Sequence, residues 1–213
     1  MSDAALAEEF CALSRSLFER GLTHGTSGNL SARLPDGGWL VSPTNASLGR
    51  LTPARLSRLD ARGGHVSGDA PTKEWPLHTA FYATRGQRAG AVVHLHSPFA
   101  VALSCLPDLD PADCLPSLTP YPIMRLGQIP LIPYLPPGDA ALGEAILALQ
   151  GRAGAVLLAN HGPVTSAPTL AEAVANCEEF EAAARLAITL RGMSARTLSA
   201  HQQAELLARF PRS

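Results

Sequence analysis

Two histidines separated by one residue carry the strongest chemical signal in the sequence. His94 and His96 end an apolar segment, residues 91–96, that is typical of a buried strand. Alternate side chains of a strand point to the same face, so both imidazoles are expected to lie together. Such a pair suits a borderline-soft cation such as zinc. A hydrogen-bonded pair and a surface strand are the alternatives that this spacing leaves open.

A third histidine follows a second apolar segment. His161 comes directly after the strand expected over residues 155–159 and precedes a turn at Gly162-Pro163. If the two strands are neighbours in one sheet, His161 reaches the face that carries the first pair. Three histidines with one open position form a catalytic rather than a structural zinc site. Taken alone, His161 is more typical of an ordinary turn residue.

A glutamate in front of a predicted helix is the candidate acid–base group. Glu74 lies where a loop meets a helix expected over residues 76–85. A carboxylate in this place can transfer protons beside a metal, or it can simply interact with the helix N-terminus. His78, one turn further on, is a possible ligand, but packing within the helix or support of the ligands from behind is favoured.

Short segments rich in glycine and hydroxyl groups offer contacts for a phosphate. Residues 27–29 and 42–45 supply hydroxyls, amides and backbone N–H groups, and Thr72 and Lys73 add a hydroxyl and a cation. Each segment by itself is also typical of a turn, and Lys73 can be a solvated side chain. The chain contains neither a Walker motif nor a dinucleotide-binding fingerprint.

The elements that must position these residues are of mixed type. Hairpins come early, around residues 35–38 and 61–64, and strands and helices do not alternate regularly afterwards. This pattern favours a mixed sheet with helices on both faces over a doubly wound parallel sheet. The proline-rich segment 107–138 is expected to be irregular and functional. Further helices are expected over residues 3–20, 98–106, 139–150, 169–191 and 198–209, and strands over 30–34 and 39–42.

Composition excludes several classes of protein. With 213 residues, 46% hydrophobic and 16% charged, the chain can bury a core, and residues 1–213 are expected to form one domain. A net charge of -1 and 5% aromatic residues give no reason to expect a nucleic-acid or membrane partner. Four scattered cysteines and the absence of a signal-peptide pattern indicate free thiols and a cytoplasmic protein. The charge-free stretch 89–107 is interpreted as a strand, a turn and a helix.

Taken in order, these motifs resemble the class II aldolase/adducin family. The resemblance covers about residues 5–191, and its specificity lies in the ordered set rather than in any one motif. It implies a three-layer α/β/α sandwich with a central mixed, largely antiparallel sheet, and a homotetramer with its sites at subunit interfaces. The motifs are Gly25-Thr26-Ser27-Gly28-Asn29-Leu30-Ser31, Ser42-Pro43-Thr44, Glu74 with His78, His94-Leu95-His96 and Asn160-His161-Gly162.

The resemblance also implies a role for each residue of the site. His94, His96 and His161 would bind Zn²⁺, or another divalent ion such as Mn²⁺ or Co²⁺. Glu74 matches the family's acid–base glutamate, which can also approach the metal in the empty site. Tyr121 matches a tyrosine that serves as proton donor in family aldolases. The positions that match those holding the substrate phosphate are Gly28, Asn29, Thr44 and Thr72.

Three runs resemble one branch of the family, the 3-oxo-tetronate 4-phosphate decarboxylases. They are residues 42–51, 68–74 and 158–164. Asn45 stands where sugar-phosphate aldolases commonly have glycine, and Lys73 where they often carry a small hydroxyl residue. The lysine would help to hold a substrate with both a phosphate and a carboxylate. The implied reaction is zinc-dependent decarboxylation of this acid to dihydroxyacetone phosphate and carbon dioxide, through an enediolate that the metal stabilises.

Two other functions are weighed against this one. Aldol cleavage of a sugar phosphate such as L-fuculose 1-phosphate forms the same enediolate, so the site alone does not decide between the two reactions. A non-catalytic interaction module, as in the adducin branch, is expected to lack the metal ligands, whereas this chain keeps them. The expected partner is therefore a small phosphorylated sugar acid.

Overall fold

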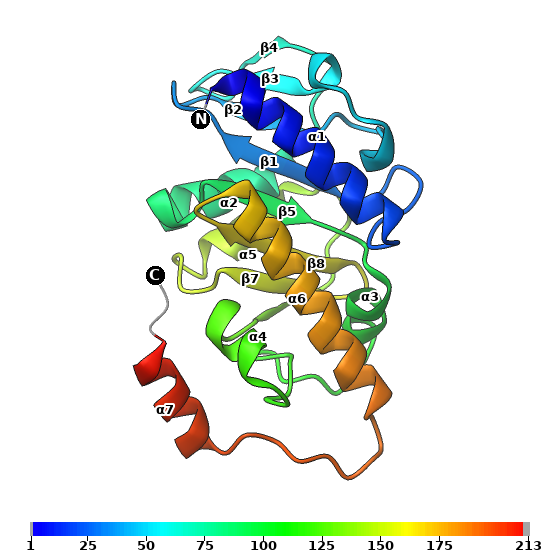
Figure 1. Ribbon diagram of the computed structural model, residues 1–213, viewed down its shortest axis with the longest axis vertical. Coiled ribbons are helices and arrows are strands. Elements are labelled where there is room, and N and C mark those ends of the chain that lie inside the picture. Colours follow the sequence, from blue (N-terminus) through cyan, green and yellow to red (C-terminus); the bar gives the residue numbers. More distant parts are fainter. Residues whose placement is uncertain (1, 211–213) are drawn as a thin grey trace.

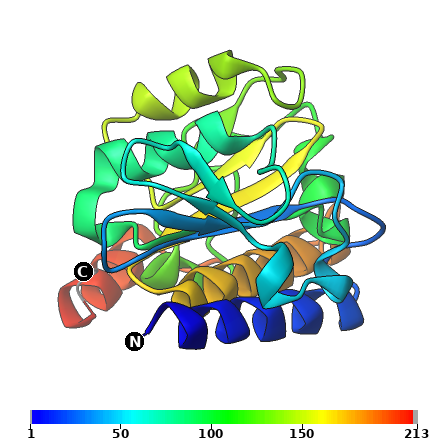
Figure 2. The same ribbon diagram turned by 90° about the horizontal axis from the view of Figure 1, so that it is seen from above.

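The computed structural model describes residues 2–210 and shows one sheet between two layers of helices (Figures 1 and 2). The strand order is β4-β3-β2-β1-β5-β8-β7-β6. Neighbouring strands run antiparallel, except that β6 and β7 are parallel. The predicted three-layer fold with a mixed, largely antiparallel sheet is confirmed.

Hairpins build the N-terminal half of the sheet. β1 (Asn29–Arg33) pairs with β2 (Trp39–Val41), which in turn pairs with β3 (Ser57–Leu59). β4 (His65–Ser67) closes this edge by pairing with β3. Both predicted hairpins are confirmed, because their Gly-containing turns fall between the paired strands.

The C-terminal half contains a strand that the sequence does not reveal. β8 (Gly162–Ala167) begins where only a turn is predicted, and it lies between β5 (Ala91–His94) and β7 (Ala155–Leu158). The two apolar strands are therefore not direct neighbours, and His161 comes from the turn between β7 and β8. Pro163 masks the strand because it lacks an N–H, yet its carbonyl still accepts from the Leu95 N–H at 3.3 Å.

The histidine pair does not share one strand. β5 ends at His94, so the predicted strand over 91–96 is too long, and His96 lies in the loop that follows. The chain must leave the sheet here because Pro98 starts the helix α3 (Pro98–Ser104), with Ser97 as its N-cap in extended conformation.

Helices cover both faces of the sheet, as Figure 2 shows. α2 (Trp75–Arg85) and α5 (Ala140–Leu147) pack against each other on one face. The other face carries α1 (Asp3–Glu19), α3 and α6 (Leu170–Thr189). The remaining helices are α4 (Pro120–Arg125), α7 (Ala200–Arg209) and the short 3₁₀ turns η1 (Leu48–Arg50), η2 (Pro53–Arg55) and η3 (Gly86–Arg88).

The two-residue period of β1 decides which of its residues serve the core and which serve the site. Leu30 and Ala32 are buried in the apolar cluster that includes α1 and α6 residues. Asn29 and Ser31 point to the opposite layer, where both contact His78 of α2. One strand thus supports the core with one face and places polar groups behind the candidate site with the other.

The structure also tests the predictions for the proline-rich segment and for the charge-free stretch. The segment 107–138 is not wholly irregular, because α4 and the two-residue strand β6 (Leu131–Ile132) form within it. The charge-free stretch 89–107 forms β5 and α3, as interpreted. Across residues 2–210, every helix is too short or too polar to cross a bilayer.

Candidate functional site

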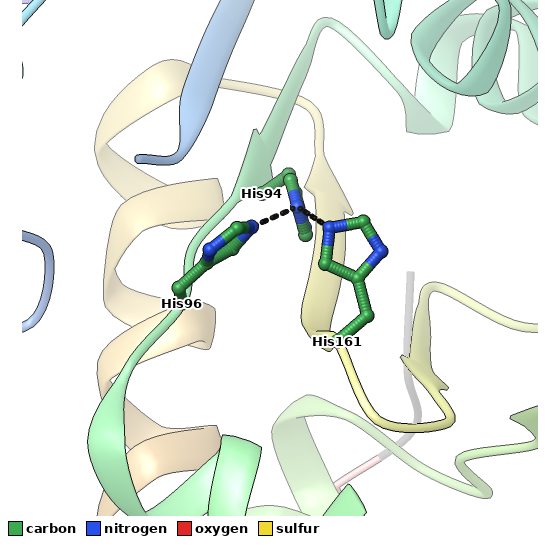
Figure 3. Close-up of side chains that lie close together, drawn as sticks. All are labelled: His94, His96 and His161. Atoms are coloured by element: carbon green, nitrogen blue, oxygen red, sulfur yellow. Dashed lines mark hydrogen bonds between the residues drawn. The ribbon is translucent and has the colours of Figure 1, made fainter. Parts of the chain in front are cut away.

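Three histidine rings converge at one end of the central strands (Figure 3). The His94 Nε2 atom lies 3.1 Å from Nε2 of His96 and 3.3 Å from Nε2 of His161. One nitrogen from each ring lies within 4.8 Å of the others. The sequence prediction that these three residues meet is confirmed, although only His94 comes from a strand.

The turn that carries His161 fits closely against the loop of His96. Asn160 adopts a left-handed conformation with φ 56°, which asparagine tolerates better than most residues. At Gly162 a side chain is excluded, since a Cβ atom would lie 2.4 Å from the Leu95 carbonyl oxygen. This contact explains the Asn-His-Gly order and brings His161 to the two other rings.

The hydrogen bond behind His94 orients its imidazole. The ring is fully buried, and its Nδ1–H donates to the Pro163 carbonyl oxygen at 2.9 Å. A neutral histidine with the proton on Nδ1 has its lone pair on Nε2, which faces the other two rings. The His94 ring is therefore oriented so that its Nε2 lone pair can bind a metal ion.

The electrostatics of the cluster fit a divalent cation. Burial lowers the pKa of His94, of His96 and of His161, the last to about 4, so the three rings are neutral at neutral pH. Within residues 2–210, the buried Glu74 Oε1 atom has no hydrogen-bond partner, and it lies 3.6 Å from His161 Nε2. Neutral imidazoles and an ionised carboxylate are the donors that Zn²⁺ prefers.

Glu74 faces the histidines and does not cap its helix. It occupies the N-cap position of α2, but its side chain makes no capping hydrogen bond. Its Oε2 lies 3.6 Å from His94 Nε2 and its Oε1 lies 3.6 Å from His161 Nε2. Burial alone would raise the pKa of this carboxyl, but the neighbouring histidines, His94 first, and the hydrogen bond from Asn29 together outweigh burial and hold the pKa below its ordinary value.

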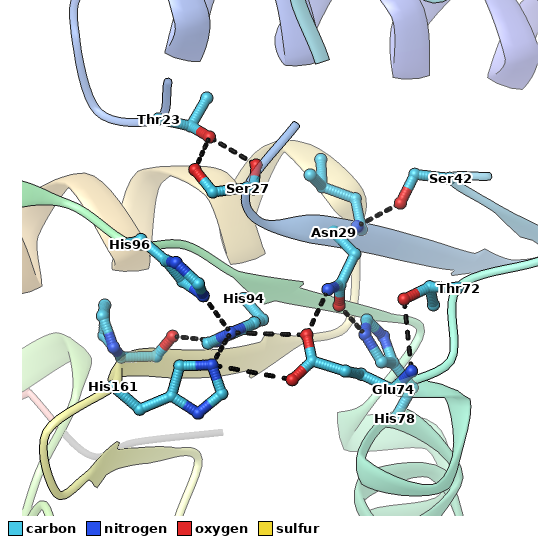
Figure 4. Close-up of polar contacts among 12 residues, drawn as sticks. Thr23, Ser27, Asn29, Ser42, Thr72, Glu74, His78, His94, His96 and His161 are labelled. Carbon is cyan, nitrogen blue, oxygen red and sulfur yellow. Dashed lines mark hydrogen bonds and ion pairs between the residues drawn. The ribbon is translucent and has the colours of Figure 1, made fainter. Parts of the chain in front are cut away.

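A second row of polar residues stands behind Glu74 (Figure 4). Asn29 Nδ2 donates to Glu74 Oε2 at 2.6 Å, and His78 Nε2 lies 2.5 Å from Asn29 Oδ1. His78 is outside the cluster of possible ligand atoms, and its contact agrees with the interpretation that it supports the site from behind. Burial lowers its pKa to about 3, so this ring is also neutral.

The residues matched to phosphate binding line one cavity of about 160 Å³ beside the histidines. Gly28 must be a glycine there, because its φ is +78° and a Cβ atom would lie 3.0 Å from the His94 carbonyl oxygen. Asn45 has φ 55°, a left-handed conformation that glycine adopts freely and that asparagine tolerates better than most residues. The cavity is lined by Thr26, Ser27, Gly28, Asn29, Pro43, Thr44, Asn45, Thr72, Lys73, Glu74, His96, Pro137 and His161.

A second cavity of about 500 Å³ continues the first one and shares His96, His161 and Pro137 with it. Sequence reasoning misses two of its aromatic lining residues, His24 and Tyr134. Each stands alone in a loop and belongs to no motif, so the sequence contains no signal for either residue.

Tyr121 is absent from the lining of both cavities. It lies on α4, which packs against α6 and α7, and it is 59% exposed. The structure of the single chain therefore brings together every candidate residue except this tyrosine.

The buried neutral state of His78 is expected to make folding stability depend on pH. An unfolded histidine titrates near pH 6.5, whereas the folded His78 has a pKa of about 3. Acid therefore favours the unfolded chain, and protonation of this residue should lower the free energy of unfolding by about 1.4 kcal/mol per pH unit between pH ~6.5 and the folded pKa of about 3, with its full contribution present above pH ~6.5. Urea unfolding of wild type and His78→Gln at several pH values measures the difference in slope. Equal slopes would contradict the neutral assignment.

Comparison with known proteins identifies the family. Residues 8–188 match the family model described as the class II aldolase and adducin N-terminal domain. The chain belongs to this family. Among curated relatives, the 3-oxo-tetronate 4-phosphate decarboxylase of Escherichia coli K12 is 45% identical over 204 residues, which cover 96% of each chain. The L-fuculose phosphate aldolase of the same organism is 37% identical over 172 residues, 79% of this chain and 76% of that protein.

A solved structure of the class II aldolase fold matches almost the whole chain. The crystal structure of YgbL from Klebsiella pneumoniae superimposes with a TM-score of 0.93 at 46% sequence identity, covering 97% of this chain and 99% of that chain. The family assignment and the three-layer fold thus agree with the resemblance of the motifs.

Proposed function

We propose that this class II aldolase family member decarboxylates a 3-oxo-tetronate 4-phosphate to dihydroxyacetone phosphate and carbon dioxide. The observation that carries the proposal is one shared site: His96, His161, the Glu74 carboxylate and Lys73 line one cavity, and the Nε2 atom of the buried His94 lies against the other two histidine rings. The 45% identity to the Escherichia coli decarboxylase supports this reaction over others of the family.

The three histidines would hold a divalent cation, for which we propose Zn²⁺, with Mn²⁺ or Co²⁺ as alternatives. When bound, this ion would supply Lewis-acid charge that withdraws electrons from the keto group next to the bond that breaks. Glu74 fits the acid–base role better than that of a fourth ligand, because Asn29 holds one of its oxygens.

The residues of the cavity would orient the substrate and manage one proton. The loops of Gly28, Thr44 and Thr72 would bind the phosphate through N–H and hydroxyl groups. The C1–C2 bond breaks, carbon dioxide leaves and the electron pair remains on the four-carbon acid's C2–C3 unit. C2 must then gain a proton from solvent, and Glu74 is placed to carry it.

Lys73 is proposed to recognise the extra negative charge of the acid substrate. It is the only lysine of the chain, and it is exposed at the cavity. In Lys73→Ser, KM for the acid phosphate should rise about tenfold, and KM for a neutral ketose phosphate should rise less. Steady-state kinetics on both substrates, with Arg62→Ser as a remote cation control, measure this. Equal rises on both substrates would contradict the charge argument.

Tyr121 is proposed to act in the site of a neighbouring copy within a homotetramer. The proposal is supported by the exposure of Tyr121 and by its absence from the lining of the cavity. Co-expression of His94→Ala chains with Tyr121→Phe chains should restore activity that neither homo-oligomer shows, because mixed neighbours recreate a complete site. Failure of the mixed oligomers to gain activity would exclude action across subunits.

The test of the reaction is product analysis. Purified protein loaded with zinc is given both C2 epimers of the phosphorylated keto acid, with and without chelator, and carbon dioxide is measured. We expect carbon dioxide to be released from one or both epimers, and we expect the chelator to abolish this release.

The second candidate function, aldol cleavage, is favoured by the 37% identity to L-fuculose phosphate aldolase. An aldehyde from L-fuculose 1-phosphate without carbon dioxide from the acids would establish that function instead.

A further inference from the structure

We propose that Tyr82, Ser31 and His78 form a relay of positioning residues that acts through Asn29 to hold the Glu74 carboxylate in its acid–base position. The significance of this relay for catalysis rests on the function proposed above. Its geometry stands on four consecutive hydrogen bonds between β1 and α2 residues.

The four hydrogen bonds are short and continuous. Asn29 bridges Glu74 and His78 through its amide, at 2.6 and 2.5 Å. On the other side of the imidazole, Ser31 Oγ lies 2.7 Å from His78 Nδ1, and Tyr82 OH lies 2.7 Å from Ser31 Oγ. The chain thus runs from a buried phenol to the carboxylate that faces the histidine cluster.

The chemistry of the groups allows one direction of donation only. An ionised carboxylate accepts, so Asn29 must turn its NH₂ group to Glu74 and its oxygen to His78. An amide oxygen also only accepts, so His78 carries its proton on Nε2. Its Nδ1 lone pair then accepts from Ser31, whose oxygen accepts from Tyr82. A flipped amide would place an oxygen against the Glu74 carboxylate.

Burial makes every bond of the relay difficult to replace by water. Ser31 and His78 are fully buried, Asn29 is 4% exposed and Tyr82 is 5% exposed. Trp75 stacks on the His78 ring with a centroid distance of 6.1 Å. Removing one hydroxyl would therefore leave a buried polar group unsatisfied and would free the neighbouring group to reorient.

The relay explains why the Glu74 carboxylate lies near the histidines and yet is held back from them. Asn29 holds Oε2, while Oε1 has no hydrogen-bond partner among the described residues. Both carboxylate oxygens stay 3.6 Å from the nearest histidine Nε2 atoms. We infer that loss of the relay lets the carboxylate move toward a bound metal, which would convert a proton carrier into a ligand.

The direction of the relay can be tested without any metal or substrate. In metal-free protein with ¹⁵N-labelled histidine, NMR should show His78 as the neutral tautomer with its proton on Nε2. Assignment follows from the loss of that signal in His78→Gln. A wild-type His78 with its proton on Nδ1 would overturn the proposal, because Asn29 could then not receive a hydrogen bond.

The effect on Glu74 is tested by kinetics with paired variants. Ser31→Ala and Tyr82→Phe should lower kcat, by about 10- to 100-fold for Ser31→Ala and less for Tyr82→Phe, with KM changed by less than about twofold. His78→Gln retains a donor for Asn29 and should keep more activity than His78→Leu. Thr165→Val removes an equally buried hydroxyl bond, from Thr165 to the Ala173 carbonyl, and controls for stability.

A spectroscopic readout separates this proposal from the function on which it rests. In Co²⁺-loaded protein, Ser31→Ala should change the visible absorption bands, because Glu74 joins the metal, whereas Thr165→Val should leave the bands unchanged. If wild type releases no carbon dioxide, the proposed function fails, and the tautomer and the Co²⁺ bands still decide the relay. Wild-type-like bands and kcat in Ser31→Ala would overturn it.

Discussion

His94→Ala is expected to abolish tight metal binding and catalysis together. The ring is fully buried, and its Nε2 lies within 3.3 Å of the Nε2 atoms of both other histidines, so its removal leaves two ligands that cannot enclose an ion. Loss of the Lewis acid removes several kcal/mol of stabilisation from the transition state, so turnover should fall by about 10³-fold or more. Metal content after dialysis and carbon dioxide release measure the two effects on the same samples.

A matched histidine controls this experiment. His201 is exposed on α7, and His201→Ala should retain both metal and turnover. Circular dichroism and thermal unfolding establish that the His94 variant is folded. A folded His94→Ala protein that retains one zinc per chain and full activity would remove the metal hypothesis.

Glu74→Gln is expected to separate metal binding from proton transfer. Glutamine has nearly the same shape, and its amide oxygen can still accept from Asn29, so the side chain should stay in place. The three histidines remain, and metal content should be unchanged. If Glu74 carries the proton to C2, turnover should fall by about 10²–10⁴-fold. Stopped-flow or discontinuous assay of carbon dioxide, together with metal analysis, gives both values.

The control for this substitution is Glu144→Gln, which makes the same chemical change at an exposed position of α5. It should leave turnover at the wild-type value. Unchanged turnover in Glu74→Gln would reassign the proton to Tyr121 or to water, and the mixed-oligomer experiment would then distinguish these two sources.

Local patterns in the sequence predicted most of the elements and the members of the histidine cluster. The helix α5 begins where Asp139 accepts a hydrogen bond from the Ala141 N–H, and α7 begins with a capping box at Ser199. These signals lie within four residues of one another, so propensity and side-chain chemistry suffice to read them. The sequence did not predict the strand β8, because Gly162 and Pro163 have turn propensity. Only pairing with β5 and β7 makes them part of a strand.

The relay behind Glu74 could not be predicted for a related reason. Ser31 and Tyr82 lie far apart in the sequence, and although Ser31 ends the first motif, no motif includes Tyr82 or links the two residues. Their contact depends on the register of β1 in the sheet and on the rotation of α2 over it. A shift of one residue in that register would turn Ser31 to the opposite face.

The amino-acid sequence by itself determined which chemical groups the candidate site can use: three of the seven histidines, Glu74, the lysine and the glycines that let loops approach them. The tertiary structure alone decided how they cooperate, because the rings meet through a strand, a loop and a turn, and because a buried polar chain selects the direction in which Glu74 faces. Residue types follow from the covalent chain, whereas distances between segments follow from the packing of the sheet against its helices, which no local pattern contains.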